Sequence, residues 1–203
     1  MGSDSIASHA TTSTAASNST RNPVSTSSKA IESDPIEENT QYDFVLYTDG
    51  AYFKQKQLGG WGVAIFTVKH TALVSKPSHP PAKTLQTLSG CQLSHSSLEM
   101  ELIAAIKALE WILMHHPKAS ISLVTDAQIL LEGLFVKYPN WQANQWRSNN
   151  NNPVAFAQLW QRFHQLAHLV DVHFFWTKGH FKNQGNQLAD QLARQRILKI
   201  STE

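Results

Sequence analysis

The sequence predicts an α/β fold with a mixed sheet. Short runs rich in β-branched and aromatic residues, the first being Val45–Gly50, indicate strands. A longer stretch with apolar residues at helical spacing follows the first three runs. The predicted order is three strands, a helix, a strand, further helices, a last strand and a final helix. The first three strands pair most simply as antiparallel neighbours, and the whole order is typical of an α/β arrangement.

The 203 residues allow one domain with a tail, or two very small domains. Residues 1–40 are mainly Ser, Thr, Ala and Asn, and they cannot bury enough apolar surface to offset their ordering entropy. We therefore expect a disordered, Ser/Thr-rich acidic leader over 1–40 and one folded domain over 41–200. The leader is interpreted as a solvating tail, and a tether to a partner protein is the alternative.

Charge is distributed unevenly along the chain. Residues 1–43 hold two basic and six acidic residues, and residues 44–203 hold fifteen and nine, so the two parts carry net charges of −4 and +6. A basic domain favours a polyanionic partner. The single cysteine, Cys91, excludes a disulfide within the chain and a cysteine zinc site, and it suits the reducing cytoplasm. No apolar run is long enough to span a membrane, so we expect a cytoplasmic location.

The first three strands are expected before the long helix. The first runs from Gln41 to Asp49, where an aspartate meets Gly50 and the chain is expected to turn. A glycine-bearing turn over 57–60 should lead into a second strand, Trp61–Phe66. The third strand is expected over Thr84–Leu93.

The long helix has a predicted start and end. Ser96 with Glu99 three positions later forms a capping-box signature. Pro117 cannot continue a helix, so the helix should stop near His116. Its apolar stripe consists of Leu98, Leu102, Ala105, Ile106, Leu109, Ile112 and Leu113.

The second half of the chain continues the pattern. Ile121–Asp126 is a further short strand ending on an aspartate, and a short helix should follow and close near Gly133. Pro153 is expected to be the first residue of a later helix, with Asn152 as its cap. Val172–Thr177 is the expected last strand, before the final helix.

Four acids stand out as candidate functional residues. Asp49 and Asp126 end strands, whereas Glu101 and Asp190 lie early on helices. If the first and fourth strands are neighbours, Asp49 and Asp126 lie side by side. Carboxylates this close raise one another's pKa unless a divalent cation holds them. Oxygen ligands favour Mg²⁺ or Mn²⁺, and the matching reaction is phosphodiester hydrolysis with two metal ions.

Each acid taken alone also has an ordinary explanation. Asp49 could form a turn, and Asp126 could cap the helix that follows it. Asp190 could stabilise a helix N-terminus, and Glu101 could be solvated. Glu99 competes with Glu101, but its place in the capping box leads us to assign the chemistry to Glu101.

Several separated motifs together resemble type 1 ribonuclease H of the bacterial kind. They are Thr48-Asp49-Gly50, Met100-Glu101-Leu102, Thr125-Asp126, and Trp176-Thr177-Lys178-Gly179-His180 with Leu188-Ala189-Asp190-Gln191-Leu192-Ala193. They occur in order and the resemblance covers roughly residues 42–196. It implies a five-stranded mixed sheet, with the first three strands antiparallel, flanked by helices.

The resemblance also implies an activity. This activity is endonucleolytic cleavage of the RNA strand of RNA–DNA hybrids, with Mg²⁺ and with Mn²⁺ as a substitute, leaving 5′-phosphate and 3′-hydroxyl ends. By position, Asp49, Glu101, Asp126 and Asp190 match the metal-binding catalytic carboxylates. His180 matches a loop histidine that assists proton transfer or product release. The implied partner is the hybrid duplex, bound by a monomer.

Residues 137–147 correspond to the basic protrusion with which the family grips the hybrid. This chain has Gln142, Ala143 and Asn144 where relatives are rich in lysine or arginine, so we expect weaker binding with a shallower salt dependence. Packing alone is the alternative explanation for the two tryptophans. The residues expected to bind substrate are Lys137, Trp141, Trp146, Arg147, Lys178 and Asn186.

Two other functions are alternatives to hybrid cleavage. One is a relative with the same fold but another task, such as a DNA-strand transferase or a junction nuclease, and the Lys178–His180 loop argues against it. The other is a non-catalytic nucleic-acid-binding module, and the presence of all four acids argues against that.

Overall fold

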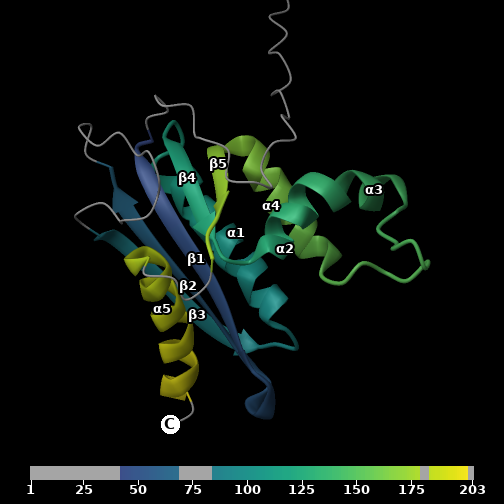
Figure 1. Ribbon diagram of the computed structural model, residues 1–203, viewed down its shortest axis with the longest axis horizontal. Helices are drawn as coiled ribbons and strands as arrows, with labels where there is room; N and C mark the ends of the chain where they lie inside the picture. Colours follow the sequence, from purple (N-terminus) through teal and green to yellow (C-terminus); the bar gives the residue numbers. More distant parts are fainter. Residues whose placement is uncertain (1–41, 69–83, 179–182, 201–203) are drawn as a thin grey trace, which may run out of the picture.

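The computed structural model describes residues 42–68, 84–178 and 183–200 (Figure 1). The predicted leader, residues 1–40, and the candidate histidine His180 lie outside the described residues. None of the helices in the described ranges is long and apolar enough to cross a membrane. The elements are β1 (Phe44–Phe53), the 3₁₀-helix η1 (Lys54–Lys56), β2 (Leu58–Thr67), β3 (Thr84–Leu93), α1 (Ser97–His115), β4 (Ser120–Thr125), α2 (Gln128–Leu131), the π-helix η2 (Glu132–Lys137), α3 (Tyr138–Ala143), α4 (Ala157–Leu169), β5 (Asp171–Trp176) and α5 (Gln184–Ile200).

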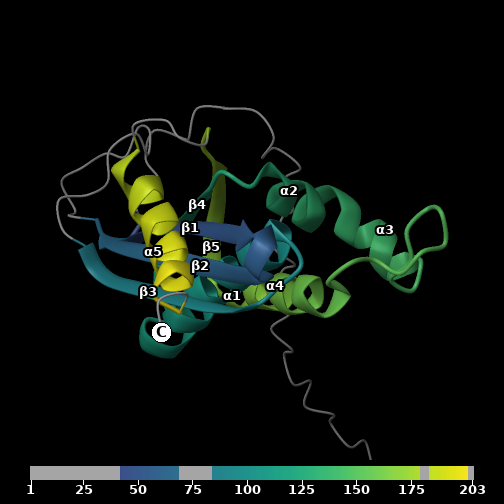
Figure 2. The same ribbon diagram turned by 90° about the horizontal axis from the view of Figure 1, so that it is seen from below.

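The five strands form one sheet in the order β3-β2-β1-β4-β5. β1 pairs with β2, and β2 with β3, in antiparallel fashion, whereas β4 pairs in parallel with both β1 and β5. Helix α5 covers one face of the sheet, and α1 and α4 lie on the other (Figures 1 and 2). The predicted mixed five-stranded sheet is therefore confirmed.

Strand β1 is buried on both faces, which explains its continuous apolar sequence. Phe44 and Leu46 belong to a core cluster with residues of α1 and α4. Val45 and Tyr47 alternate with them and pack into a second cluster with Ala189 of α5. The strand therefore joins the two halves of the core.

The prediction that the first strand ends at Asp49 is wrong. Pairing of β1 with the parallel strand β4 stops at Thr48 opposite Thr125, but pairing with β2 continues to Phe53. Asp49 consequently lies inside a strand, at the first position where one edge of β1 has no β4 beside it.

The predicted turn over 57–60 is also wrong. The turn is η1 followed by Gln57, which has a φ of 50°, and the next glycines lie within β2. A Cβ at Gly60 would lie 2.1 Å from the Ala193 oxygen, and one at Gly62 would lie 2.2 Å from the Ala189 oxygen. These glycines are needed for the close approach of α5 to the sheet, not for a turn.

Helix α1 has the predicted boundaries, but Glu99 accepts hydrogen bonds from Ser94 and His95 and not from the Ser96 N–H of a capping box. The Ser96 side chain accepts a hydrogen bond from the Leu98 N–H at 3.1 Å. The Glu99 carboxylate accepts from the Ser94 hydroxyl at 2.7 Å and from the His95 N–H at 3.4 Å. Glu99 therefore has a structural task at the helix entry, as expected.

Two predictions between β4 and α4 are wrong. The helix after β4 does not close at Gly133 but continues through η2 into α3. This glycine is needed for packing and not for a helix end, because a Cβ at Gly133 would lie 2.1 Å from the Trp160 ring. Pro153 does not begin a helix. It pairs with Arg147 in an isolated bridge, and α4 begins at Ala157. The α2–α3 segment projects beside the sheet as an arm (Figure 1).

Gly62→Ala should destabilise the protein by about 1–3 kcal/mol, because the added methyl overpacks the contact with the α5 backbone. Urea unfolding followed by circular dichroism measures the change in free energy. Thr87→Ala on exposed β3 is the control and should stay within about 0.5 kcal/mol of the parent. Equal stability of Gly62→Ala and the parent would contradict the close packing of α5.

Candidate active site

The candidate site lies where β4 ends. Asp49 follows the last residue of β1 that pairs with β4, and Asp126 follows the last residue of β4. The two strands are neighbours in the sheet, so the expected juxtaposition of these acids is confirmed. By the alternation of the strand, Asp49 projects with Tyr47 and Ala51 toward the α5 face.

Glu101 reaches the same place from the opposite face. It lies on α1, which comes very close to β1 at Gly50, where an added Cβ would lie 2.4 Å from the Glu101 nitrogen. Both Glu101 and Asp49 are only 8% exposed. Carboxylates from both faces of the sheet thus meet beyond the end of β4.

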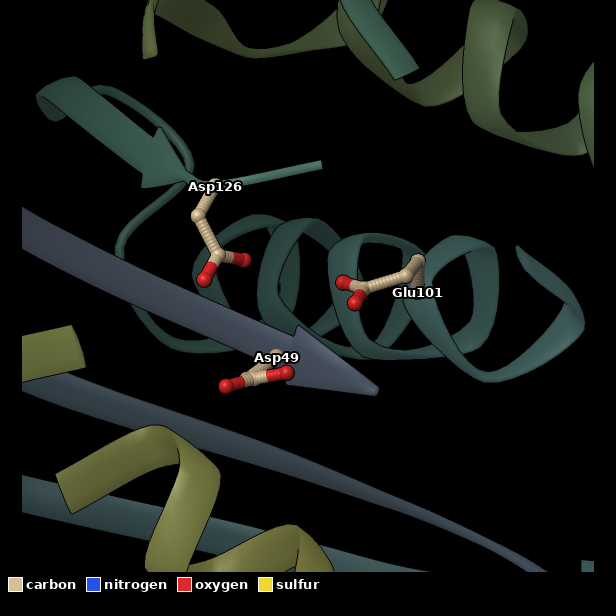
Figure 3. A group of neighbouring side chains, drawn as sticks. All are labelled: Asp49, Glu101 and Asp126. Carbon is tan, nitrogen blue, oxygen red and sulfur yellow. The ribbon is translucent and has the colours of Figure 1, made fainter. Parts of the chain in front are cut away.

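Three carboxylates form a compact group. Asp49, Glu101 and Asp126 each offer one oxygen, and these three oxygens lie within 4.8 Å of one another. Figure 3 shows the three side chains pointing toward one another from β1, α1 and the segment after β4. Such a group can hold a cation between its members.

Burial and mutual repulsion oppose ionisation of this group. Burial, together with the charges of Asp126 and Asp190, raises the pKa of Asp49 from 3.8 to about 7. Burial and the charges of Asp49 and Asp126 raise the pKa of Glu101 well above its ordinary value. A bound cation would relieve the repulsion and favour the ionised forms.

Asp190, the fourth predicted acid, lies nearby but outside the three-carboxylate group. The Arg194 Nε donates to its Oδ1 at 2.5 Å, in an ion pair along α5. The charge of Asp190 still raises the pKa of Asp49. Arg194 was not predicted from the sequence, although its position four residues after Asp190 is the spacing that places two helical side chains together.

Two asparagines arrange the start of α5. The Asn183 side chain accepts hydrogen bonds from the Gly185 and Asn186 N–H groups, and so caps the helix. The Asn186 Nδ2 donates to the Asp126 Oδ2 at 3.2 Å, which orients that carboxylate. Asn186 was expected as a substrate contact, whereas the cap at Asn183 was missed.

The residues of the site fit a hard divalent cation. All the candidate donors are oxygens, which such ions prefer. The Glu101 Oε2 and the Asn186 Oδ1 are buried and have no hydrogen-bond partner among the described residues. Buried polar atoms are normally satisfied, so these orphaned oxygens are explained by an ion and its water shell.

The other expected substrate residues lie elsewhere. Lys178 is exposed after β5. Lys137 donates to Glu132 at 3.1 Å, and Arg147 donates to the Asn151 carbonyl at 2.9 Å. A hollow of about 330 Å³ in the arm is lined by Lys137, Asn140, Trp141, Arg147, Ser148, Asn149 and Asn150.

The two arm tryptophans take part in packing. The Trp141 ring lies 5.3 Å from that of Trp160, and the Trp146 ring lies 5.3 Å from that of Tyr138. Both are partly buried against the core. Packing therefore accounts for much of their surface, while Trp141 also lines the hollow.

Comparison with known proteins gives consistent results. A sequence model of the family described as RNase H matches residues 41–198. A curated relative named Ribonuclease H, from Ruthia magnifica subsp. Calyptogena magnifica, is 35% identical over 158 residues, which are 78% of this chain and 97% of the relative.

Two solved structures share the fold. The PFV RNase H domain has a TM-score of 0.61 and 24% identity, with 77% of this chain and 95% of that chain covered. The foamy viral protease-reverse transcriptase in complex with RNA/DNA hybrid has a TM-score of 0.62 and 18% identity, with 82% of this chain and 22% of that chain covered.

Asp49→Asn should stabilise the metal-free protein by about 1–3 kcal/mol at about pH 8, and have little effect at about pH 4. The raised pKa of Asp49 means that the folded protein keeps a proton which the unfolded chain has already released between pH 3.8 and about 7. Stability from this group is therefore lost as the pH rises through that window. A neutral amide avoids the loss.

Urea unfolding in the presence of a chelator, at both pH values, measures this effect. Asp171→Asn, at an exposed position of β5 beside His173, is the matched control and should show a smaller difference between the two pH values. A destabilised Asp49→Asn variant at the higher pH would contradict the electrostatic account of the site.

Proposed function

The chain belongs to the ribonuclease H family, and from this premise we propose that it cleaves the RNA strand of RNA–DNA hybrids. Family membership places it among the nuclease hydrolases. The cleavage is endonucleolytic, depends on Mg²⁺ or on Mn²⁺ as a substitute, and leaves 5′-phosphate and 3′-hydroxyl ends. A cytoplasmic location, expected from the single Cys91, is part of the proposal.

One observation carries it. Oxygens of Asp49, Glu101 and Asp126, drawn from three separate elements, lie within 4.8 Å of one another. The Glu101 Oε2 is buried and has no hydrogen-bond partner in the part of the chain that the structure describes. A structural role does not explain such an arrangement, because bringing carboxylates together without a cation is unfavourable. Hydrolysis of a phosphodiester is the chemistry that cations held by carboxylates commonly support.

The mechanism assigns tasks to this chain's residues. Asp49, Glu101, Asp126 and Asp190 would hold two divalent ions, which when bound supply activation of water and stabilisation of the leaving oxygen. Asn186 keeps the Asp126 carboxylate oriented through its 3.2 Å hydrogen bond. All four acids belong to one chain, so a monomer is sufficient for cleavage.

His180 completes the proposed site. It follows Gly179 in a polar stretch of the sequence, ten positions before Asp190, and it lies outside the described residues. An imidazole there has a pKa range suited to carrying a proton between the reacting oxygens and water. Its role is to assist turnover, not to hold the ions.

Substrate selection rests on the shape of the hybrid and on its 2′-hydroxyls, without reading base sequence. Lys178 is exposed after β5 and would contact a phosphate. Lys137 and Arg147, at the hollow in the arm with Trp141, are proposed to contact the duplex farther along, and Trp146 to support them. Few cations in the arm favour weak binding with a shallow salt dependence.

Asp49→Asn should lower the rate of hybrid cleavage by about 10³-fold or more, ~4 kcal/mol, while the fold stays intact. Labelled RNA–DNA hybrid, double-stranded RNA and double-stranded DNA, each with and without Mg²⁺, measure activity and substrate class together. We expect cleavage only of the hybrid, and only with the ion. Asp171→Asn serves as the active control, and cleavage of DNA in place of the hybrid would favour a junction nuclease.

His180→Ala should reduce turnover by about 10–100-fold without abolishing it, because a positioned acid–base group assists but is not required for ion binding. His173→Ala, on exposed β5, is the control. The rate of the parent enzyme should change across the neutral pH range, and this dependence should weaken in His180→Ala. A parent rate that is flat with pH would remove the proton-transfer role.

A further inference from the structure

Within the described ranges, the outer edge of the sheet at β3 has little of the usual protection against association. β3 is an outer strand, paired with β2 on one side, and no other strand of the described residues pairs with its other side. Its ten residues include no charged residue and no proline. A register shift in its pairing with β2 lies at its start, at Leu85, and leaves the rest of the strand regular. Unpaired strand edges recruit other strands, and natural sheets commonly block them with charge or proline. The opposite edge strand, β5, is shorter and carries Asp171 beside His173.

The backbone direction along β3 follows from one hydrogen bond. The Ser94 N–H donates to the Gln57 carbonyl at 3.0 Å, next to the β2 strand. In an antiparallel ladder, both backbone groups of a residue point to the same side, and the side alternates along the strand. Ser94 and every second residue before it therefore face β2. The residues between these direct their N–H and C=O groups outward, away from β2. They are Leu93, Cys91, Ser89 and Thr87.

This outward set is self-complementary. A two-fold axis through Ser89 places Ser89 opposite its own copy and Thr87 opposite Cys91 of a second chain. Each pair then consists of two residues whose backbone groups point outward, which is the condition for hydrogen-bonded pairs in an antiparallel ladder. The register is thus compatible with continuous pairing over Thr87–Cys91.

The side chains repeat the same symmetry. Residues 85–93 read Leu-Gln-Thr-Leu-Ser-Gly-Cys-Gln-Leu, with leucines at both ends and glutamines next to them. Beyond the regular part of the strand, the axis brings Leu85, at the register shift, near Leu93 of the other chain, and these leucines are 43% and 74% exposed. It also places Gln86 opposite Gln92. Two large exposed apolar side chains per copy would be covered by each other.

We propose that two copies of this chain pair through β3, antiparallel, about a two-fold axis at Ser89. The partner is a second copy because the register that satisfies the outward backbone groups also matches like side chains across the axis. Such a two-fold interface uses the same surface on both copies. Its area is that of two short strands, so the dimer is weak and depends on concentration. The proposed dimer differs from the monomer that the family resemblance implies. One chain alone still holds all four carboxylates of the candidate site.

The pairing has a geometric consequence for the candidate sites. Asp49, Gly62 and Ser89 lie in one row across β1, β2 and β3. The axis is perpendicular to the sheet, so both sites lie on the same side, separated by five strand spacings or roughly 24 Å.

Two matched variants test the register. Gln86→Lys with Gln92→Lys places like charges opposite each other at both cross-strand pairs, whereas Gln86→Glu with Gln92→Lys places opposite charges there. Each variant carries two substitutions. Both contain Gln92→Lys, so both change the contact between the Gln92 Nε2 and the Glu99 Oε1, which lie 3.5 Å apart. The dissociation constants of the two variants should differ by about tenfold or more.

Sedimentation equilibrium of the full chain, from low-micromolar to near-millimolar concentration, measures association. We expect a parent dimer at the upper end, a largely monomeric double-lysine variant, and a dimer for the glutamate–lysine variant. A parent that stays monomeric throughout would overturn the proposal, and so would equal association of the two variants. Hybrid cleavage by the monomeric variant reports separately on the proposed function.

Discussion

The site depends on the close approach of two helices to the same stretch of the β1–β2 ribbon, from opposite faces. Gly50 lets α1 come close enough to deliver Glu101, and Gly62, paired with Asp49, lets α5 come close enough to deliver Asp190. The faces of a sheet are normally separated by the sheet itself. Beyond Thr48, β1 has no β4 beside it. Carboxylates from both faces of the sheet can therefore meet at this open edge of β1.

This arrangement places function and stability in conflict. A buried group of carboxylates weakens the metal-free fold at neutral pH, and the surrounding core has to compensate. The compensation is visible in the two apolar clusters that hold β1 from both faces. Arg194 adds a local counter-charge for Asp190, which lowers the repulsion felt by Asp49 without occupying the space between the other three acids.

Much of the fold and the site could be predicted because β-rich runs and helical stripes are local patterns. Asp126 follows a β-rich run, whereas the adjacency of β1 and β4, which brings Asp49 beside it, was only a condition of the prediction. What could not be predicted depended on distant partners. Gly60 resembled a turn residue because its contact with Ala193 is tertiary. Pro153 suggested a helix start because its bridge to Arg147 is invisible in the local sequence.

The π-helix η2 has a consequence for the direction of the arm. A π-turn spans about one residue more than an α-turn, and each residue of a helix turns the chain by about 100°. η2 thereby sets the phase in which Tyr138 and Trp141 face α4, where their rings lie against His164 and Trp160. Loss or gain of one residue in this segment would re-aim the whole arm with its surface chemistry unchanged. The direction of the arm therefore depends on the number of residues in η2. A single codon insertion or deletion there would give relatives with differently directed arms.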